Sequence, residues 1–129
     1  MATTRHKTTE NAGYPRRGEI YLTALDPAVG REIQKTRPAL VIQNDVSNRL
    51  SEVTIVAPIT STVRFPLSPV HVLLGAGSGT GLSVTSVAVF SQIRAVDRVR
   101  LIKRLGVVDT EIMEQVDEAI KISLGLLAL

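Results

Sequence analysis

The stretch that decides the fold runs from residue 30 to residue 60 and reads GREIQKTRPALVIQNDVSNRLSEVTIVAPIT. Residues 38–43 form an almost continuous apolar run, which predicts a central strand buried on both faces. Residues 53–60 place apolar side chains at every second position, which predicts another strand, with a turn at residues 43–50 between the two. Polar side chains gather at the strand ends, where a rigid scaffold presents functional groups.

Three more strands are expected outside this stretch. Residues 18–25 alternate, with Leu22 on the apolar face and Thr23 on the other, which is typical of a half-buried strand. Residues 69–74 and 83–93 are further apolar segments and predict a short and a long strand.

An amphipathic helix is expected near the C-terminal end. Asp109 is a preferred N-cap residue, and Glu111 follows it near the positive end of the helix dipole. Apolar and small residues then recur at helical spacing over about five turns: Ile112, Val116, Ala119, Ile120, Ser123 and Leu127. Short strands followed by a terminal helix predict a mainly β, α+β fold, a small and mostly antiparallel barrel.

The domain organisation is simple. Residues 1–15 are polar and lack periodicity, so we expect a flexible tail that ends at Pro15. Residues 16–129 are expected to form one domain, because no linker divides them and the chain of 129 residues suffices for one core. The glycine-rich residues 75–81 lack the spacing of dinucleotide-binding and P-loop motifs, and they predict a mobile hairpin loop.

Composition excludes several kinds of site. The chain has no cysteine, which excludes disulfides, thiolate metal sites and a cysteine nucleophile. Its histidines, His6 and His71, show no ligand spacing, so we expect no metal and no cofactor. No apolar run is long enough to span a membrane and no signal peptide is evident, which favours a cytoplasmic protein.

Charge is distributed unevenly along the chain. Residues 18–108 carry ten Lys or Arg against six Asp or Glu, whereas residues 109–129 carry one Lys against five Asp or Glu. A basic β body indicates an anionic partner such as nucleic acid, although a solvated surface explains the same charges.

A group of polar residues fits phosphoryl transfer. Glu32, Lys35 and Arg37 precede the central strand, and Pro38 holds Arg37 extended at its mouth. Thr60, Gln92 and Arg94 are candidates to meet them. Because a guanidinium matches phosphate oxygens, this set suits a reaction in which RNA supplies its own 2′-OH as nucleophile. An ordinary ion-paired surface stays an open alternative.

Several short motifs, in order and at matching spacing over nearly all of residues 16–127, resemble the MazF/PemK family of toxin endoribonucleases. They are Arg17-Gly18-Glu19-Ile20-Tyr21, Asp26-Pro27, Gly30-Arg31-Glu32, Arg37-Pro38-Ala39-Leu40-Val41-Ile42-Gln43-Asn44-Asp45, and Gln92-Ile93-Arg94 with Asp97. The chain departs from the family in its polar tail, in Lys35-Thr36 where a glycine is common, and in Ser91 where an acid is common.

The resemblance implies an SH3-like barrel of the MazF/CcdB/Kid type and a homodimer that cleaves single-stranded RNA without metal. It also implies neutralisation by a cognate, MazE-like antitoxin. The family's catalytic positions fall on Arg37, Thr60 and Glu32. The RNA-contacting positions expected here are Lys35, Asn44, Ser61, Gln92 and Arg94.

Two other functions use similar barrels. CcdB-type gyrase poisons bind without cleaving and depend on a C-terminal tryptophan, whereas this chain has none and ends Leu126-Leu127-Ala128-Leu129. A non-catalytic nucleic-acid-binding barrel would expose aromatic side chains for stacking, and the chain has only two tyrosines and two phenylalanines. Both stay open as alternatives to the ribonuclease.

Overall fold

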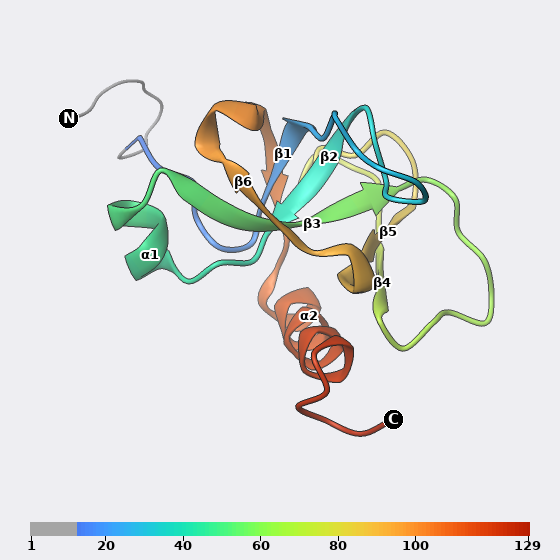
Figure 1. Cartoon of the computed structure of the whole chain (residues 1–129). Coiled ribbons are helices and arrows are strands. Elements are labelled where there is room, and N and C mark those ends of the chain that lie inside the picture. Colours follow the sequence, from blue (N-terminus) through green and yellow to red (C-terminus); the bar gives the residue numbers. More distant parts are fainter. Residues whose placement is uncertain (1–12) are drawn as a thin grey trace.

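A curved antiparallel sheet with one long helix beneath it makes up the computed structural model, which describes residues 13–129 (Figure 1). The expected tail therefore lies mostly outside the described residues, and Pro15 at its end is buried. The elements in chain order are β1 Glu19–Ala24, β2 Thr36–Val41, α1 Asp45–Leu50, β3 Val53–Thr60, β4 His71–Leu74, β5 Ser86–Val89, the 3₁₀ turn η1 Phe90–Gln92, β6 Arg94–Asp97, the 3₁₀ turn η2 Arg98–Arg100, β7 Leu101–Val107 and α2 Thr110–Ser123.

The strand β3 is the hub of the sheet. Strands follow the order β4-β5-β3-β2-β1-β7, and β6 pairs with the first half of β3. Residues 53–56 of β3 pair with β6, and Ile59 and Thr60 pair with β5. Pro58 lies between the two segments, where β3 has no partner on that side, which suits a residue without a backbone N–H. The expected mostly antiparallel sheet with a C-terminal helix is confirmed.

The glycine-rich residues 75–81 pack against β7. They join the antiparallel pair β4 and β5, so the predicted hairpin connection is confirmed. A Cβ on Gly81 would lie 2.0 Å from the carbonyl oxygen of Leu105, and its φ is +73°. The backbone N–H of Val107 donates to the carbonyl of Gly79 at 2.9 Å. The segment therefore contacts β7 through a backbone hydrogen bond at Gly79 and a close approach at Gly81 that only glycine permits.

The central strand is buried on both faces, as its apolar run predicts. Leu40 packs with Ala57 and Ile59 in a larger core that also contains Val116 of α2. On the other face, Val41 belongs to a smaller core. Strand ends near both cores are thus fixed in place by packing.

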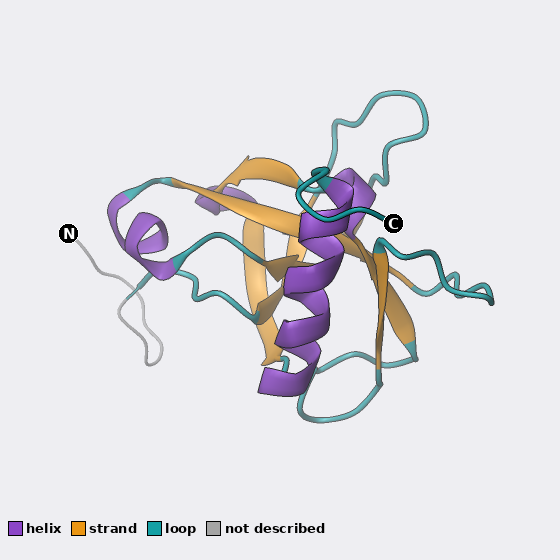
Figure 2. Cartoon of the chain, turned by 90° about the horizontal axis from the view of Figure 1, so that it is seen from below, coloured by secondary structure: helices purple, strands orange, loops and turns teal. Residues whose placement is uncertain are grey.

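The helix α2 begins where its cap predicts, because the Asp109 carboxylate accepts a hydrogen bond from the Ile112 N–H at 2.9 Å. It packs against β4 and η1 and crosses beneath the sheet (Figure 2). The helix is shorter than the predicted five turns, since Gly125 adopts a φ of +79° just beyond it and Leu127 is 41% exposed.

Three local expectations were wrong. The predicted turn at residues 43–50 contains the short helix α1, which periodicity cannot reveal in six residues. The alternation in β1 fails because register shifts against β7 leave Thr23 buried and Leu22 half-buried. The long strand predicted at residues 83–93 spans only Ser86–Val89, because the chain then turns into η1.

Candidate functional site

Arg37 lies near the start of β2 and Thr60 at the end of β3, so both stand at the same end of two neighbouring strands. Ala39 pairs with Pro58, and continuing this register by two residues places Arg37 opposite Thr60. The Arg37 Nε donates to the carbonyl of Gln34 at 2.8 Å, which fixes the base of the guanidinium. Within residues 13–129, the Nη groups of Arg37 have no protein partner. Two charged donor groups are therefore available to an anion at this end of β2.

The predicted site residues divide between two hollows. Arg37 and Ser61 line a hollow of about 290 Å³. Glu32, Gln92 and Arg94 line another of about 350 Å³. Successive residues of β3 reach the two hollows, since Pro58 lines the second and Ile59 the first. Alternation along a strand explains the division.

The loop that carries Glu32 is tied down at several points. The Glu32 Oε1 accepts from the Val29 N–H at 2.7 Å, so the carboxylate is turned onto its own loop. The Gln92 Oε1 accepts from the Ile33 N–H at 2.7 Å and anchors the loop to η1. Among the described residues, no ion pair joins Glu32 to Arg37.

Lys35 holds the return of this loop toward β2. Its N–H donates to the Asp26 carboxylate at 2.9 Å, and its carbonyl accepts from the Leu25 N–H at 3.0 Å. Its φ of +74° lies in the left-handed region that favours glycine. This conformation gives a physical reason for the glycine that the resemblance leads one to expect near this position.

Three arginines of the basic β body, Arg94, Arg98 and Arg100, donate hydrogen bonds to the protein's own backbone carbonyls. Arg94 Nη1 donates to the Leu25 carbonyl at 2.9 Å. Arg98 Nη1 donates to the Ser51 carbonyl at 3.1 Å, and Arg100 Nη1 donates to the Ala24 carbonyl at 2.9 Å. These arginines fasten loops that are distant in sequence. Arg98 Nη2 also donates to the Gly13 carbonyl and Arg100 Nη1 to the Asp26 carbonyl, so only the N–H groups outside these bonds are left for a ligand.

Asn44 is not brought together with the other predicted residues. It follows the opposite end of β2 from Arg37, next to α1 (Figure 1). Its side-chain oxygen accepts from the Ser47 N–H at 2.8 Å and caps α1. Its position in the fold is that of a helix cap.

Comparison with known proteins gives these residues a context. A family model described as PemK-like, MazF-like toxin of type II toxin-antitoxin system matches residues 16–124. The chain belongs to this family. It is 43% identical over 112 residues to Endoribonuclease EndoA of Bacillus subtilis (strain 168), covering 87% of this chain and 96% of that protein. The chain is accordingly a toxin endoribonuclease of the MazF type.

Solved structures share the fold of this toxin. MazF from Deinococcus radiodurans superposes with a TM-score of 0.73 at 26% identity, over 87% of this chain and 97% of that one. A mycobacterial endoribonuclease in complex with its cognate antitoxin gives 0.72 at 24% identity, over 89% and 99% of the two chains. The expected MazF-like fold is confirmed.

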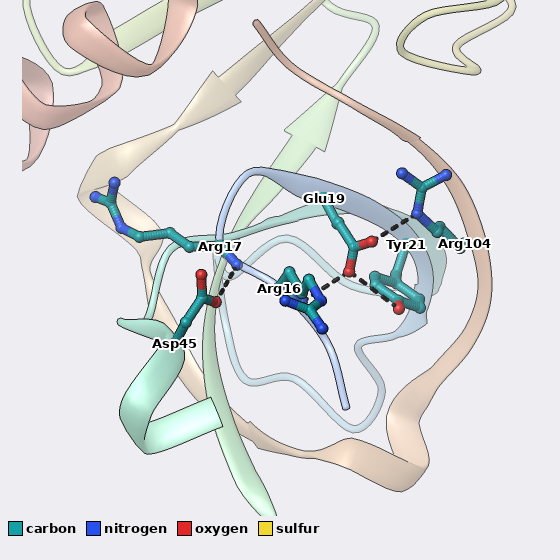
Figure 3. A network of polar contacts seen from close by, with 6 residues as sticks. All are labelled: Arg16, Arg17, Glu19, Tyr21, Asp45 and Arg104. Atoms are coloured by element: carbon teal, nitrogen blue, oxygen red, sulfur yellow. Dashed lines mark hydrogen bonds and ion pairs between the residues drawn. The ribbon is translucent and has the colours of Figure 1, made fainter. Parts of the chain in front are cut away.

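A polar network that the sequence did not point to supports the start of β1 in this toxin (Figure 3). The buried Glu19 carboxylate accepts from Arg104 Nε at 2.6 Å, from the Arg16 N–H at 2.7 Å and from the Tyr21 hydroxyl at 3.3 Å. Burial of Tyr21, reinforced by the negative charge of Glu19 and by their hydrogen bond, raises the pKa of Tyr21 above its ordinary value. The phenol therefore stays a donor.

Arg17 links four segments of the toxin. Its N–H donates to the Asp45 carboxylate at 2.7 Å, its Nε to the Ile42 carbonyl at 2.7 Å, and its Nη2 to Asp117 of α2 at 2.6 Å. The contacts of Arg17, Glu19 and Tyr21 thus give the Arg17-to-Tyr21 motif a structural role. Only its contiguous match to the family motif signalled that these residues matter.

In the part of the chain that the structure describes, no group of three or more His, Asp or Glu side chains is arranged to hold a metal ion. No described helix is long and apolar enough to cross a bilayer.

Proposed function

We propose that this toxin cleaves single-stranded mRNA at short sequences, without metal, by attack of a 2′-OH on the adjacent phosphate. The proton leaves the 2′-OH, the 2′-oxygen bonds to phosphorus, and the bond to the 5′-oxygen breaks as that oxygen gains a proton. The products are a 2′,3′-cyclic phosphate and a 5′-OH. The toxin would act in the cytoplasm, where cleavage of mRNA stops translation.

The observation that carries this proposal is the Arg37–Thr60 pair. The free Nη groups of Arg37 would bind the scissile phosphate and stabilise the extra negative charge of the transition state. The Thr60 Oγ1 accepts from the Thr62 N–H at 3.2 Å, which leaves its O–H free to donate to a phosphate oxygen or the 2′-oxygen.

Glu32 is the proposed base, and it would have to leave its bond to the Val29 N–H to act. Gln92 keeps its amide N–H₂ free while its oxygen anchors the loop, so it would contact RNA as a donor. Lys35 and Ser61, both exposed, and the free N–H groups of Arg94 would contact the backbone or bases. Asn44 is the weakest of these assignments, because it caps α1.

The test is cleavage of a long single-stranded RNA in EDTA, with the new 5′ ends mapped. Removing one strong charge-stabilising donor lowers the rate by about 10²–10³-fold, so Arg37→Ala is expected to lose that much. Arg49→Ala is the matched control, because Arg49 is an exposed arginine of α1. An Arg37→Ala variant as fast as wild type would refute the assignment, and intact RNA with inhibited gyrase would favour a gyrase poison.

We further propose a homodimer that a cognate MazE-like antitoxin neutralises. Support comes from family membership and from the mycobacterial relative that was solved with its cognate antitoxin. Light scattering of the purified toxin tests the dimer. Restored growth on coexpression of a MazE-like antitoxin tests neutralisation.

A further inference from the structure

The hollow that Arg37 lines has room for more of a substrate than the phosphate alone. Pro38 and Ile59 line it where β2 begins and β3 ends. The segment after the glycine-rich loop lines it with Leu82, Ser83 and Val84. It encloses about 290 Å³, and its lining combines apolar side chains with serines and Arg37.

The wall opposite Pro38 is held in shape by the fold. Gly81 has a left-handed φ of +73°, and a Cβ there would lie 2.0 Å from the Leu105 carbonyl oxygen, so only glycine fits this turn. The next residue, Leu82, is only 6% exposed, and its N–H donates to Thr80 Oγ1 at 3.3 Å. Ser86 Oγ donates to the Val84 carbonyl at 2.9 Å. The hollow is thus formed before any ligand arrives.

The chemistry of the hollow fits a nucleobase. A base has two apolar faces and a polar edge. Val84 offers an apolar side chain that is 51% exposed. The Ser61 and Ser83 hydroxyls are exposed and have no partner among residues 13–129, so they are free to meet the edge. No aromatic side chain lines the hollow, so aliphatic contact takes the place of stacking.

We propose that this hollow binds the base of the nucleotide next to the phosphate on Arg37, and that Ser83 and Val84 determine which base is accepted there. The inference rests on the proposed RNA cleavage, because Arg37 must hold a phosphate for the adjoining base to reach the hollow. Ser83 and Val84 are specificity-determining residues and take no part in the chemical step.

Two substitutions and two controls test this. Val84→Trp fills the hollow and Ser83→Ala removes one hydroxyl. Val99→Trp places the same bulk on an 82% exposed valine elsewhere, and Thr85→Ala removes an exposed neighbouring hydroxyl that does not line the hollow. Cleavage of a randomised single-stranded RNA, read by sequencing the new 5′ ends, gives the base preference at every position around the cut.

Val84→Trp is expected to lower kcat/KM at the preferred site by about 10–100-fold and to flatten the base preference at one position adjoining the cut. Ser83→Ala is expected to change the preference at that same position by about 2–10-fold. Both should leave the preference elsewhere intact, and the controls should match wild type. Circular dichroism verifies that each variant is folded.

Two results separate this inference from the proposed activity. If wild type cleaves and Val84→Trp keeps the wild-type rate and preference, or loses rate equally on all sequences, the base site is wrong and the activity stands. If wild type cleaves no RNA, the activity is wrong, and an NMR titration with nucleoside monophosphates decides the base site. Shifts concentrated at residues 82–84 would support it, and unchanged signals there would overturn it.

Discussion

Two ion pairs among residues 13–129 are predicted to contribute differently to stability although their N···O distances are the same. Arg104–Glu19 and Arg17–Asp117 both have an N···O distance of 2.6 Å. The Glu19 side chain is 8% exposed, whereas that of Asp117 is 49% exposed. Replacing each carboxylate by its amide, Glu19→Gln and Asp117→Asn, removes one charge and preserves shape.

The magnitudes follow from the donors around each group. Glu19 accepts from Arg104 Nε on one oxygen and from the Arg16 N–H and the Tyr21 hydroxyl on the other. An amide presents one oxygen and one N–H₂, so at least one donor in Glu19→Gln faces another donor. Hydrogen bonds to charged groups contribute about 1.5–3 kcal/mol, and we expect a loss of about 2–3 kcal/mol. Asp117→Asn breaks an exposed pair and should cost about 0–1 kcal/mol.

Urea denaturation measures both free energies of unfolding, with all variants at one protomer concentration because association would add to stability. Arg104 is itself 47% exposed, so water takes up its charge and keeps the loss below that of a fully buried pair. Equal losses in the two variants, within about 0.5 kcal/mol, would refute the reasoning that burial sets the weight of these pairs.

Three further predictions concern backbone and titration. Lys35→Gly should stabilise the toxin by about 1 kcal/mol, measured by the same denaturation, because it removes a left-handed lysine with φ +74°; a loss of stability would contradict it. Gly81→Ala should destabilise by about 2 kcal/mol or more because its Cβ meets a β7 carbonyl, whereas Gly79→Ala has nothing within 4 Å and should change little; similar losses would count against this account. The pKa of Tyr21 is raised in the folded state, so the stability that its phenol contributes is present below the ordinary pKa of 10.0 and is lost as pH rises through the folded-state pKa. In denaturation above pH 10.0, Tyr21→Phe should therefore lose less stability than wild type. Parallel pH profiles of the two proteins would exclude the effect.

Strong local patterns predicted most elements of the fold. The eight-residue strand β3, Val53–Thr60, agrees with its alternation, and α2 begins at the cap expected from Asp109. Local patterns failed where neighbouring elements decide. The register shifts between β1 and β7 bury Thr23, and α1 is too short to show a period.

For the site, the sequence by itself determined which side chains stand at strand ends. Pro38 extends Arg37, and the alternation of β3 carries Thr60 to the end of its strand, because both effects depend on adjacent residues. Only the tertiary structure decided how these side chains meet. The β2–β3 pairing brings the strand ends that carry Arg37 and Thr60 to the same side of the sheet, and the preceding loop places Glu32 in a different hollow from Arg37.

Tertiary contacts also decided the roles of residues that the sequence assigned to RNA binding and of residues that it did not single out. The guanidinium of Arg94 reaches the carbonyl of Leu25, 69 positions away, and that of Arg104 reaches Glu19, 85 positions away. Such contacts depend on strand order and on the curvature of the sheet. No local period encodes either, so the sequence determined which groups are available and the fold determined which of them are free to bind RNA.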